Sequence, residues 1–315
     1  MNAVGEILAS TVVVSDLEHS ARVYGEWLGL EVGEIGTIES DLAVAWRAPA
    51  TAGRRCVDLW PSSGRPVPIR LVEVPESAAQ YRTLRSYGWA ALEITVQDAD
   101  ALAAHLADSP FRVLGPPKEL ALTDRFYPFQ VAGPDGEVLY LNEVRGDLED
   151  FDLPRAASPV DHLFIAVLAS PNLEESLAFY RRLGFATGDA VPIAYTMINQ
   201  AFGFPADRTH ELAMVHHGRR VNVEVDQYPA ETEPRPTPQG LLPGGIACIS
   251  LAVESLGSLP VVPAGPILQR PEPPFGGRRS LVLQGAAGEM VELVEVRGGR
   301  EAVGATARHE AETPA

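Results

Sequence analysis

The sequence predicts an α+β fold built from four consecutive βαβββ modules, two in each half of the chain. Three observations carry this prediction: a strand–helix pattern near residue 10 that returns near residue 160, a weaker repeat inside each half, and a glycine-bearing turn before the last strand of each half. A chain of 315 residues, 46% of them hydrophobic, suits two compact units of about 150 residues each.

The first repeat is the strongest of the three signals. Its two copies, each an apolar strand followed by a helical pattern, lie at residues 11–14 and 17–24 and at residues 163–167 and 173–180. Leucine and tyrosine are seven residues apart in both helical segments, which keeps them on one helical face. Asp16 and Asn172 stand at the N-cap positions, and Gly29 and Gly184 stand where a helix ends in the left-handed conformation. We therefore predict two helices in equivalent places.

The weaker repeat supplies the remaining elements of each half. The first half continues with a strand, a helix and three strands at residues 92–96, 98–106, 111–114, 127–131 and 138–141. The second half continues with a strand, a short helix and three strands at residues 246–253, about 254–259, 267, 281–283 and 291–294. Further strands are predicted before these sets, at residues 70–74, 211–215 and 221–225.

The domain boundaries follow from these repeats. An acidic, proline-bearing stretch at 145–159 separates an N-terminal domain, residues 1–146, from a C-terminal domain, residues 158–297. Residues 298–315 are polar and rich in alanine and glutamate, which predicts a disordered tail.

Charge and cysteine content exclude several classes of protein. A formal net charge of -17 argues against nucleic acid, which requires a clustered positive field. The two cysteines, Cys56 and Cys248, form no CxxC pattern, so we expect no disulfide framework and a cytoplasmic location. No signal-peptide pattern and no apolar run near the ~18 residues of a membrane span is present. We expect no membrane partner.

The chain resembles the vicinal oxygen chelate superfamily, which includes glyoxalases, bleomycin-resistance proteins and extradiol dioxygenases. The resemblance covers nearly all of residues 6–296. It is carried by a V-x-D-L-x-x-S-x-x-x-Y segment at 14–24, its partner at 167–185, and GPDGEVLYL at 133–141, which is similar to the D-P-D-G-N-x-I-E-L hairpin of the family. A looser copy of that hairpin lies at 285–293. The resemblance implies that paired modules curl into two half-open barrels in tandem, one per half, around a divalent metal.

The family's ligand positions in the first half carry no usable ligand. The resemblance places them at Ala9, Ala91 and Tyr140. Alanine cannot bind a metal, and a phenol is a poor ligand for most divalent ions. We therefore expect the first half to have a degenerate site.

The second half offers a candidate metal site. The resemblance places its ligands at His162, Glu224, Cys248 and Glu292, a mixed set suited to one Fe, Mn, Co, Ni or Zn ion. Each position has a structural alternative. The alternative for His162 is a hydrogen-bonded residue at a strand edge, and the alternative for Cys248 is a small buried hydrophobe. Glu292, and Glu224 beside Asp226, are explained by strand alternation if they face solvent.

Three functions remain open at this stage. The leading one is a metal-dependent isomerase or lyase that transfers a proton on a small organic substrate with vicinal oxygens, with Glu224 or His210 as general base. The second is an extradiol dioxygenase using Fe(II), disfavoured because Cys248 stands where a second histidine is expected. The third is a metal-free small-molecule binding or resistance protein. Residues 195–208, rich in aromatic and amide side chains, are expected to line or cover the cavity. Both a monomer and a homodimer are compatible with four modules in one chain.

Overall fold

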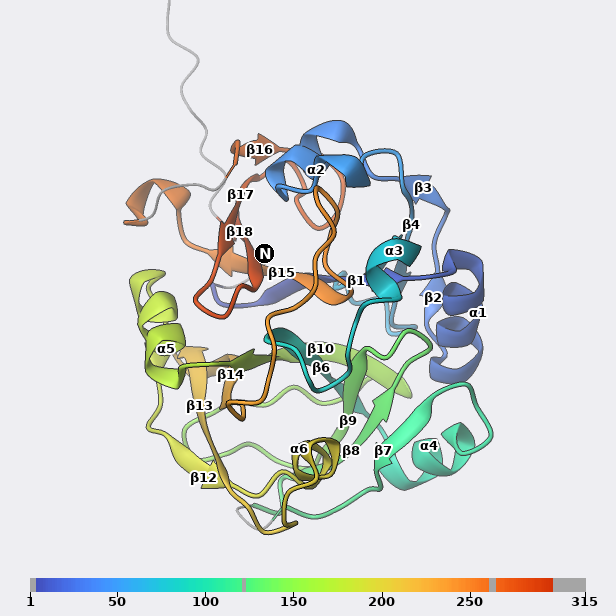
Figure 1. Cartoon of the computed structure of the whole chain (residues 1–315), viewed down its shortest axis with the longest axis vertical. Coiled ribbons are helices and arrows are strands. Elements are labelled where there is room, and N and C mark those ends of the chain that lie inside the picture. The colour runs from blue at the N-terminus through green and yellow to red at the C-terminus, as the bar shows by residue number, and fades with distance from the viewer. Residues whose placement is uncertain (1–3, 121–122, 261–264, 297–315) are drawn as a thin grey trace, which may run out of the picture.

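The computed structural model describes residues 4–120, 123–260 and 265–296, and the predicted tail at 298–315 lies outside them. Two nine-stranded mixed sheets make up the molecule (Figure 1). The predicted α+β class and the four βαβββ-like modules are confirmed. We number the modules 1 to 4, beginning with the strands β1, β6, β10 and β15.

The first sheet combines modules 1 and 4. In spatial order its strands are β16 (Leu268–Gln269), β17 (Arg279–Gln284), β18 (Met290–Glu295), β15 (Gly245–Val253), β1 (Ile7–Val14), β5 (Ile69–Glu73), β4 (Arg55–Trp60) and β2 (Glu31–Val32), with β3 (Gly36–Thr37) paired to β4.

The second sheet combines modules 2 and 3. Its strands are β11 (Ala186–Thr187), β13 (His210–His217), β14 (Arg220–Gln227), β10 (Val160–Ser170), β6 (Gly88–Val96), β9 (Val138–Val144), β8 (Phe126–Ala132) and β7 (Arg112–Gly115), with β12 (Val191–Ile193) paired to β13.

The expected one-barrel-per-half division is therefore not how the sheets are built. The first strands of modules 1 and 4 pair antiparallel, with Ser10 opposite Ile249. Those of modules 2 and 3 also pair antiparallel, with Val167 opposite Ala91. The physical reason is that each module leaves the edge of its first strand free, and that edge hydrogen-bonds equally well to a module of the other half. The boundary at 146–158 separates module 2 from module 3 along the chain, but each sheet contains strands from both sides of it.

The helices lie on the flanks of the sheets and over their ends (Figure 1). They are α1 (Leu17–Leu28), α2 (Ser40–Ala45), α3 (Pro75–Ala78), α4 (Ala99–Leu106), α5 (Leu173–Arg182) and α6 (Thr196–Phe202), with single 3-10 turns at Pro49–Thr51 and Leu256–Ser258. The predicted caps are confirmed: Asp16 accepts a hydrogen bond from the His19 amide, and Asn172 accepts one from Glu175. The short helix predicted at about 254–259 is only a 3-10 turn, because Pro260 stops it.

Each sheet has one face in a shared core and one face in a cup of its own. The shared core contains strand residues of both sheets and the buried faces of α1, α4 and α5. The face that carries Val72, Val282 and Val294, covered by α2 and Trp46, is here called the first cup. The face that carries Ala91, Val138 and Val167, covered by α6, is called the second cup.

Two buried tyrosine–glutamate hydrogen bonds tie together the modules within each half. Tyr24 of α1 donates to Glu137 Oε1 at 2.6 Å, and Tyr180 of α5 donates to Glu289 Oε1 at 3.2 Å. Each glutamate belongs to the glycine-bearing turn of the following module, and burial raises the pKa of both carboxyls to about 7. Strand pairing within the sheets thus joins modules of different halves, while these two hydrogen bonds join the two modules of the same half.

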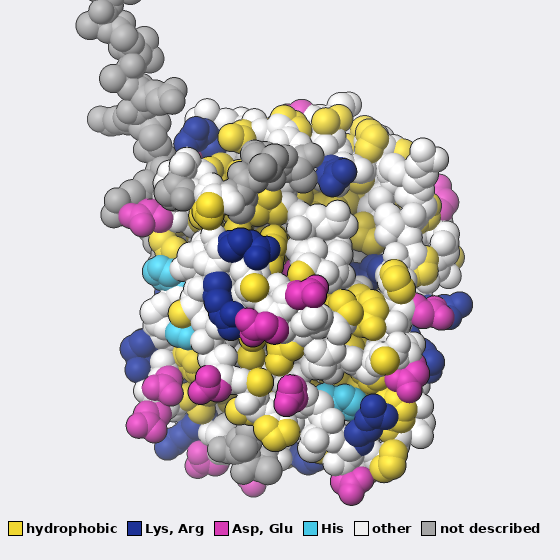
Figure 2. Space-filling model, turned by 60° about the vertical axis from the view of Figure 1, so that its left-hand side comes forward, with side chains coloured by type: hydrophobic (Ala, Val, Ile, Leu, Met, Phe, Trp, Pro, Cys, Tyr) yellow, Lys and Arg dark blue, Asp and Glu magenta, His cyan; other side chains and the backbone are white. Residues whose placement is uncertain are grey.

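On the face drawn in Figure 2, acidic and basic side chains are interspersed. Among the described residues, no helix has the length and apolar content that crossing a membrane requires. Cys56 and Cys248 are both free thiols.

Candidate functional site: a carboxyl cluster in the second cup

The structure does not bring the four predicted metal ligands together. His162 and Glu224 lie on β10 and β14 of the second sheet, whereas Cys248 and Glu292 lie on β15 and β18 of the first. Among the described residues, no three histidine, cysteine, aspartate or glutamate side chains form a group that could hold a metal ion. The reason is the module pairing, which separates modules 3 and 4 into different sheets. The expected ligand set therefore does not fit a single metal centre, and we derive no step through a metal.

Glu292 and Cys248 belong to the first cup. Glu292 is buried, and its Oε2 accepts a hydrogen bond from Ser250 Oγ at 2.6 Å. Burial raises the pKa of Glu292, while the nearby Arg70 and Arg270 oppose the rise. Burial likewise raises the pKa of the Cys248 thiol well above its usual range, which fits the small-hydrophobe interpretation.

The first cup is also filled and balanced in charge. Arg70 makes two hydrogen bonds to Asp58, at 2.8 and 3.0 Å. Leu42 of α2, Trp46 and Phe275 pack into the apolar cluster beneath the helix. Glu292 thus lies among cations and close-packed side chains, which is typical of a structural polar network.

The second cup contains three carboxyl groups. Glu224 stands beside Val167 in the parallel register, and Glu93 is opposite Ile165, so both face the cup. Asp226, two residues beyond Glu224, shares that face. All three side chains are buried, with residue exposures of 7% for Glu93 and Glu224 and 0% for Asp226.

Few donors satisfy these carboxyl groups. Tyr195 donates to Glu224 Oε1 at 2.5 Å, and Asn142 donates to Glu93 Oε1 at 2.5 Å. Neither oxygen of Asp226 forms a hydrogen bond of good geometry, although its carboxyl group lies close to that of Glu224 and to the Tyr195 hydroxyl, which is directed at Glu224. Three buried carboxyl groups with so few donors cannot all be ionised at neutral pH.

The pKa shifts follow from this environment. Burial and then the charge of Glu224 raise the pKa of Glu93 to about 8, against the effect of Asn142. Burial raises the pKa of Glu224, and burial together with the Glu224 charge raises that of Asp226 well above its usual range. No arginine or lysine among the described residues contributes to any of the three shifts. The buried carboxyl groups of the second cup are therefore neutralised by protons, whereas Glu292 of the first cup has arginines beside it.

Tyrosines surround the carboxyl cluster. Tyr140, which the resemblance placed at a lost ligand position, is beside Glu93 in the register of β6 and β9 and so faces the same cup. The hydroxyls of Tyr140 and Tyr228 are buried without hydrogen-bond partners. Burial raises the pKa of both phenols well above the usual range, so they are neutral donors.

His210 has a supporting position at the edge of the cluster. It alternates along β13 with Leu212, which is opposite Asp226, so it faces the second cup. Its Nε2 is 2.8 Å from Oδ1 of Asn199 in α6. Burial and then Arg208 lower its pKa, which favours the neutral ring. His210 thus links β13 to the helix that covers the cup.

The segment 195–208 packs against the second cup. Its helix α6 lies over the second sheet in Figure 1, and Met197 and Ile198 pack into the apolar cluster of the second cup. Tyr195, the residue before the helix, supplies the hydrogen bond to Glu224. Any molecule that reaches Glu224 from this side must displace that hydroxyl.

The sequence interpretation missed Glu93. It tested Ala91 as the inward position of β6, but Glu93 is the next residue on the same face. The available signal was a carboxylate within the apolar run Leu92, Ile94 and Val96, since such a strand is buried on both faces.

The comparisons with known proteins agree with the architecture. No model of a known protein family matches the chain, and no curated protein matches it. Among solved structures, glyoxalase I from Zea mays matches with a TM-score of 0.58 and 16% identity, covering 92% of this chain and 92% of that one. A candidate dioxygenase from Bacillus subtilis subsp. subtilis str. 168 matches with a TM-score of 0.59 and 10% identity, covering 94% of this chain and 86% of that one. At these identities the likeness concerns the fold alone, and the chain shares the tandem fold of these two structures.

Proposed function

We propose that the protein is an enzyme that transfers a proton on a small organic molecule with adjacent oxygens, bound in the second cup. The observation that carries the proposal is the carboxyl cluster Glu93, Glu224 and Asp226, which is buried without a cation to balance it. Carboxyl groups with pKa values raised towards neutrality are typical of acid–base sites. Burial also raises the pKa of Glu292 in the first cup, but there Arg70 and Arg270 lie close to the carboxyl group and oppose the rise.

The residues divide the work as follows. Glu224 is the general base: its Oε1 is held by Tyr195, and its Oε2 accepts the proton from a carbon next to a carbonyl group. The electron pair of the broken C–H bond moves to the carbonyl oxygen. Glu93, neutral at pH 7 because its pKa is about 8, donates a hydrogen bond to that oxygen and so stabilises the enolate. Glu93 then gives its proton to the enolate oxygen and takes the proton of the neighbouring hydroxyl group. Glu224 returns its proton to the former carbonyl carbon, which gives the isomeric hydroxycarbonyl compound and restores both carboxyl groups.

Solvent exchange tests the proposal without knowledge of the natural substrate. The protein is incubated in D₂O with small α-hydroxyketones and 2-hydroxy acids, and loss of the carbon-bound proton is followed by NMR. We expect exchange with the wild type and a loss of at least about 100-fold in Glu224→Gln, since general-base catalysis contributes roughly 10²–10⁴-fold. Glu292→Gln is the matched control, because it removes a buried glutamate from the last strand of the other cup.

The outcomes separate metal-free proton transfer in the second cup from chemistry in the first cup, from metal-dependent proton transfer and from binding alone. Exchange that survives in Glu224→Gln but is lost in Glu292→Gln would place the reaction in the first cup and refute the proposal. Exchange abolished by a chelator and restored by a divalent ion would refute the metal-free mechanism. Binding of the compounds without exchange under any condition would favour a binding protein.

A further inference from the structure

A cavity of about 250 Å³ lies at the seam between the two sheets. Its walls come from the beginning of β1, the β4–β5 loop, the linker between modules 2 and 3, and strands β10 and β14. His162 lines it together with Arg65 and Arg220, which accounts for the place of a histidine that is not a metal ligand. None of the carboxyl groups of the second cup is among its lining residues.

Two guanidinium groups at this cavity have donors to spare. Arg220 forms no ion pair and its side chain no hydrogen bond with any residue that the structure describes, while Nε of Arg65 is 3.4 Å from Asp161 Oδ2. That oxygen already accepts the Ala157 amide at 2.6 Å, and Oδ1 accepts the Ser63 hydroxyl. The terminal nitrogens of Arg65 are thus available to a ligand.

The acids at the cavity are engaged elsewhere. Asp152 is paired with Nε of Arg219 at 2.7 Å. Glu6 lies near Arg278, whose pKa is lowered by burial and raised by Glu6. The charge of Arg220 is therefore left unbalanced at the cavity, while Arg65 shares its charge with Asp161.

His162 adds an uncharged polar group. Burial and then Arg65 lower its pKa to about 4, so the ring is neutral at physiological pH. Its Nδ1 is buried without a hydrogen-bond partner. A neutral imidazole offers one donor and one acceptor, which is a suitable partner for a second polar group on a ligand.

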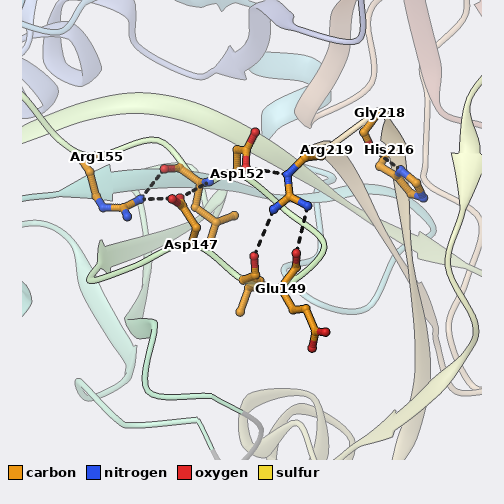
Figure 3. A network of polar contacts seen from close by, with 9 residues as sticks. Asp147, Glu149, Asp152, Arg155, His216, Gly218 and Arg219 are labelled. Carbon is orange, nitrogen blue, oxygen red and sulfur yellow. Dashed lines mark hydrogen bonds and ion pairs between the residues drawn. The ribbon is translucent and has the colours of Figure 1, made fainter.

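The linker that forms one wall is firmly fixed. In Figure 3, Arg219 at the turn between β13 and β14 reaches across to the linker. It binds Asp152 and donates to the carbonyl oxygens of Glu149, at 2.9 Å, and Leu148. Arg155 is anchored to Asp147 at 3.1 Å in the same network. The cavity wall is therefore held in place before any ligand binds, which lowers the ordering cost of binding.

We propose that this cavity binds a small organic carboxylate with an apolar body. Arginine pairs with carboxylates through two parallel hydrogen bonds. Ile7, Phe164 and Val221 supply apolar wall between the charged groups, which favours a hydrocarbon or aromatic body over a bare inorganic anion. The volume is below the roughly 300–1,000 Å³ of sites for drug-sized ligands, so the ligand is of small-metabolite size.

Calorimetric titration of the full chain with benzoate tests the assignment. Benzamide, which keeps the ring and loses the charge, and inorganic phosphate, which keeps charge and loses the ring, are the comparison ligands. We expect benzoate to bind at least about tenfold more tightly than either. Arg220→Gln and Arg65→Gln should each weaken benzoate binding about tenfold or more. Arg82→Gln, which removes an exposed ion pair away from the cavity, should not.

Two results would overturn the assignment: benzamide or phosphate binding as tightly as benzoate, or benzoate binding that is absent or insensitive to both arginine variants. Thermal unfolding of each variant checks that it is folded. Glu224→Gln should bind benzoate like the wild type, since the cavity is separate from the second cup. Weakened binding in that variant would assign the benzoate to the second cup instead.

Discussion

Replacing Glu137 with glutamine should stabilise the protein, and only at high pH. The carboxyl group is completely buried beneath α1, where its Oε1 accepts the Tyr24 hydroxyl and its Oε2 accepts the Asp135 amide. Burial raises its pKa from an ordinary 4.5 to about 7. Glutamine has the shape of the protonated acid: its oxygen accepts the Asp135 amide, and its NH₂ group donates to the Tyr24 hydroxyl oxygen.

The magnitude follows from proton linkage. Because the folded state binds this proton more tightly than the unfolded state, the carboxyl group lowers stability as pH rises from about 4.5 to about 7. Above that range the full cost is present. A pKa raised from 4.5 to about 7 corresponds to about 3 kcal/mol of unfolding free energy.

Urea unfolding at pH 5 and pH 8 measures the effect. We expect the stability of Glu137→Gln relative to wild type to increase by about 2–3 kcal/mol between the two pH values. Other buried carboxyl groups titrate in this window, but they cancel in the difference between the two proteins. Glu174→Gln, at an exposed site on α5, is the control and should show no such increase. A difference between Glu137→Gln and wild type that is the same at both pH values would refute the reasoning.

Three further predictions concern the scaffold. Tyr180→Phe removes the donor to Glu289, so urea unfolding should show a loss of about 1–3 kcal/mol that is larger at pH 8, where the carboxylate is charged. Gly244→Ala should lower stability by at least about 1–3 kcal/mol in thermal unfolding, because the new Cβ would lie 2.3 Å from the backbone oxygen of Ser77; a fully stable variant would contradict this. Arg219→Gln should change global stability by less than about 1 kcal/mol but speed proteolysis of the linker at 147–155, and unchanged cleavage would show that Arg219 does not fix it.

The elements of the fold could be predicted because they depend on local physics. Asp16 and Asn172 cap their helices as the sequence indicated, and Gly184 adopts a positive φ of 89°. The leucine–tyrosine spacing places Tyr24 and Tyr180 against the turn of the next module. These contacts join modules that are neighbours along the chain, so the repeat in the sequence predicts them in both halves.

The pairing of the modules could not be predicted in the same way. An exposed edge of β1 or β6 accepts any antiparallel strand of suitable twist, and either pairing keeps the same residues facing inward. His162 and Glu292 were therefore assigned to one site although they lie on different sheets. Glu93 was missed for the same reason, because its importance depends on Glu224, which arrives from another module.

One pair of residues explains why the two cups differ in character. The last strand of module 1 contributes Arg70 to the first cup, where it opposes the rise in the pKa of Glu292. The last strand of module 2 contributes Tyr140 to the second cup, where a phenol cannot neutralise Glu224. A buried carboxylate beside a guanidinium remains a structural ion, whereas one beside a neutral phenol must take up a proton or a ligand. Arg70 and Tyr140, both from the first half of the chain, thus decide which cup contains carboxyl groups that take up protons. Each cup is built from strands of both halves.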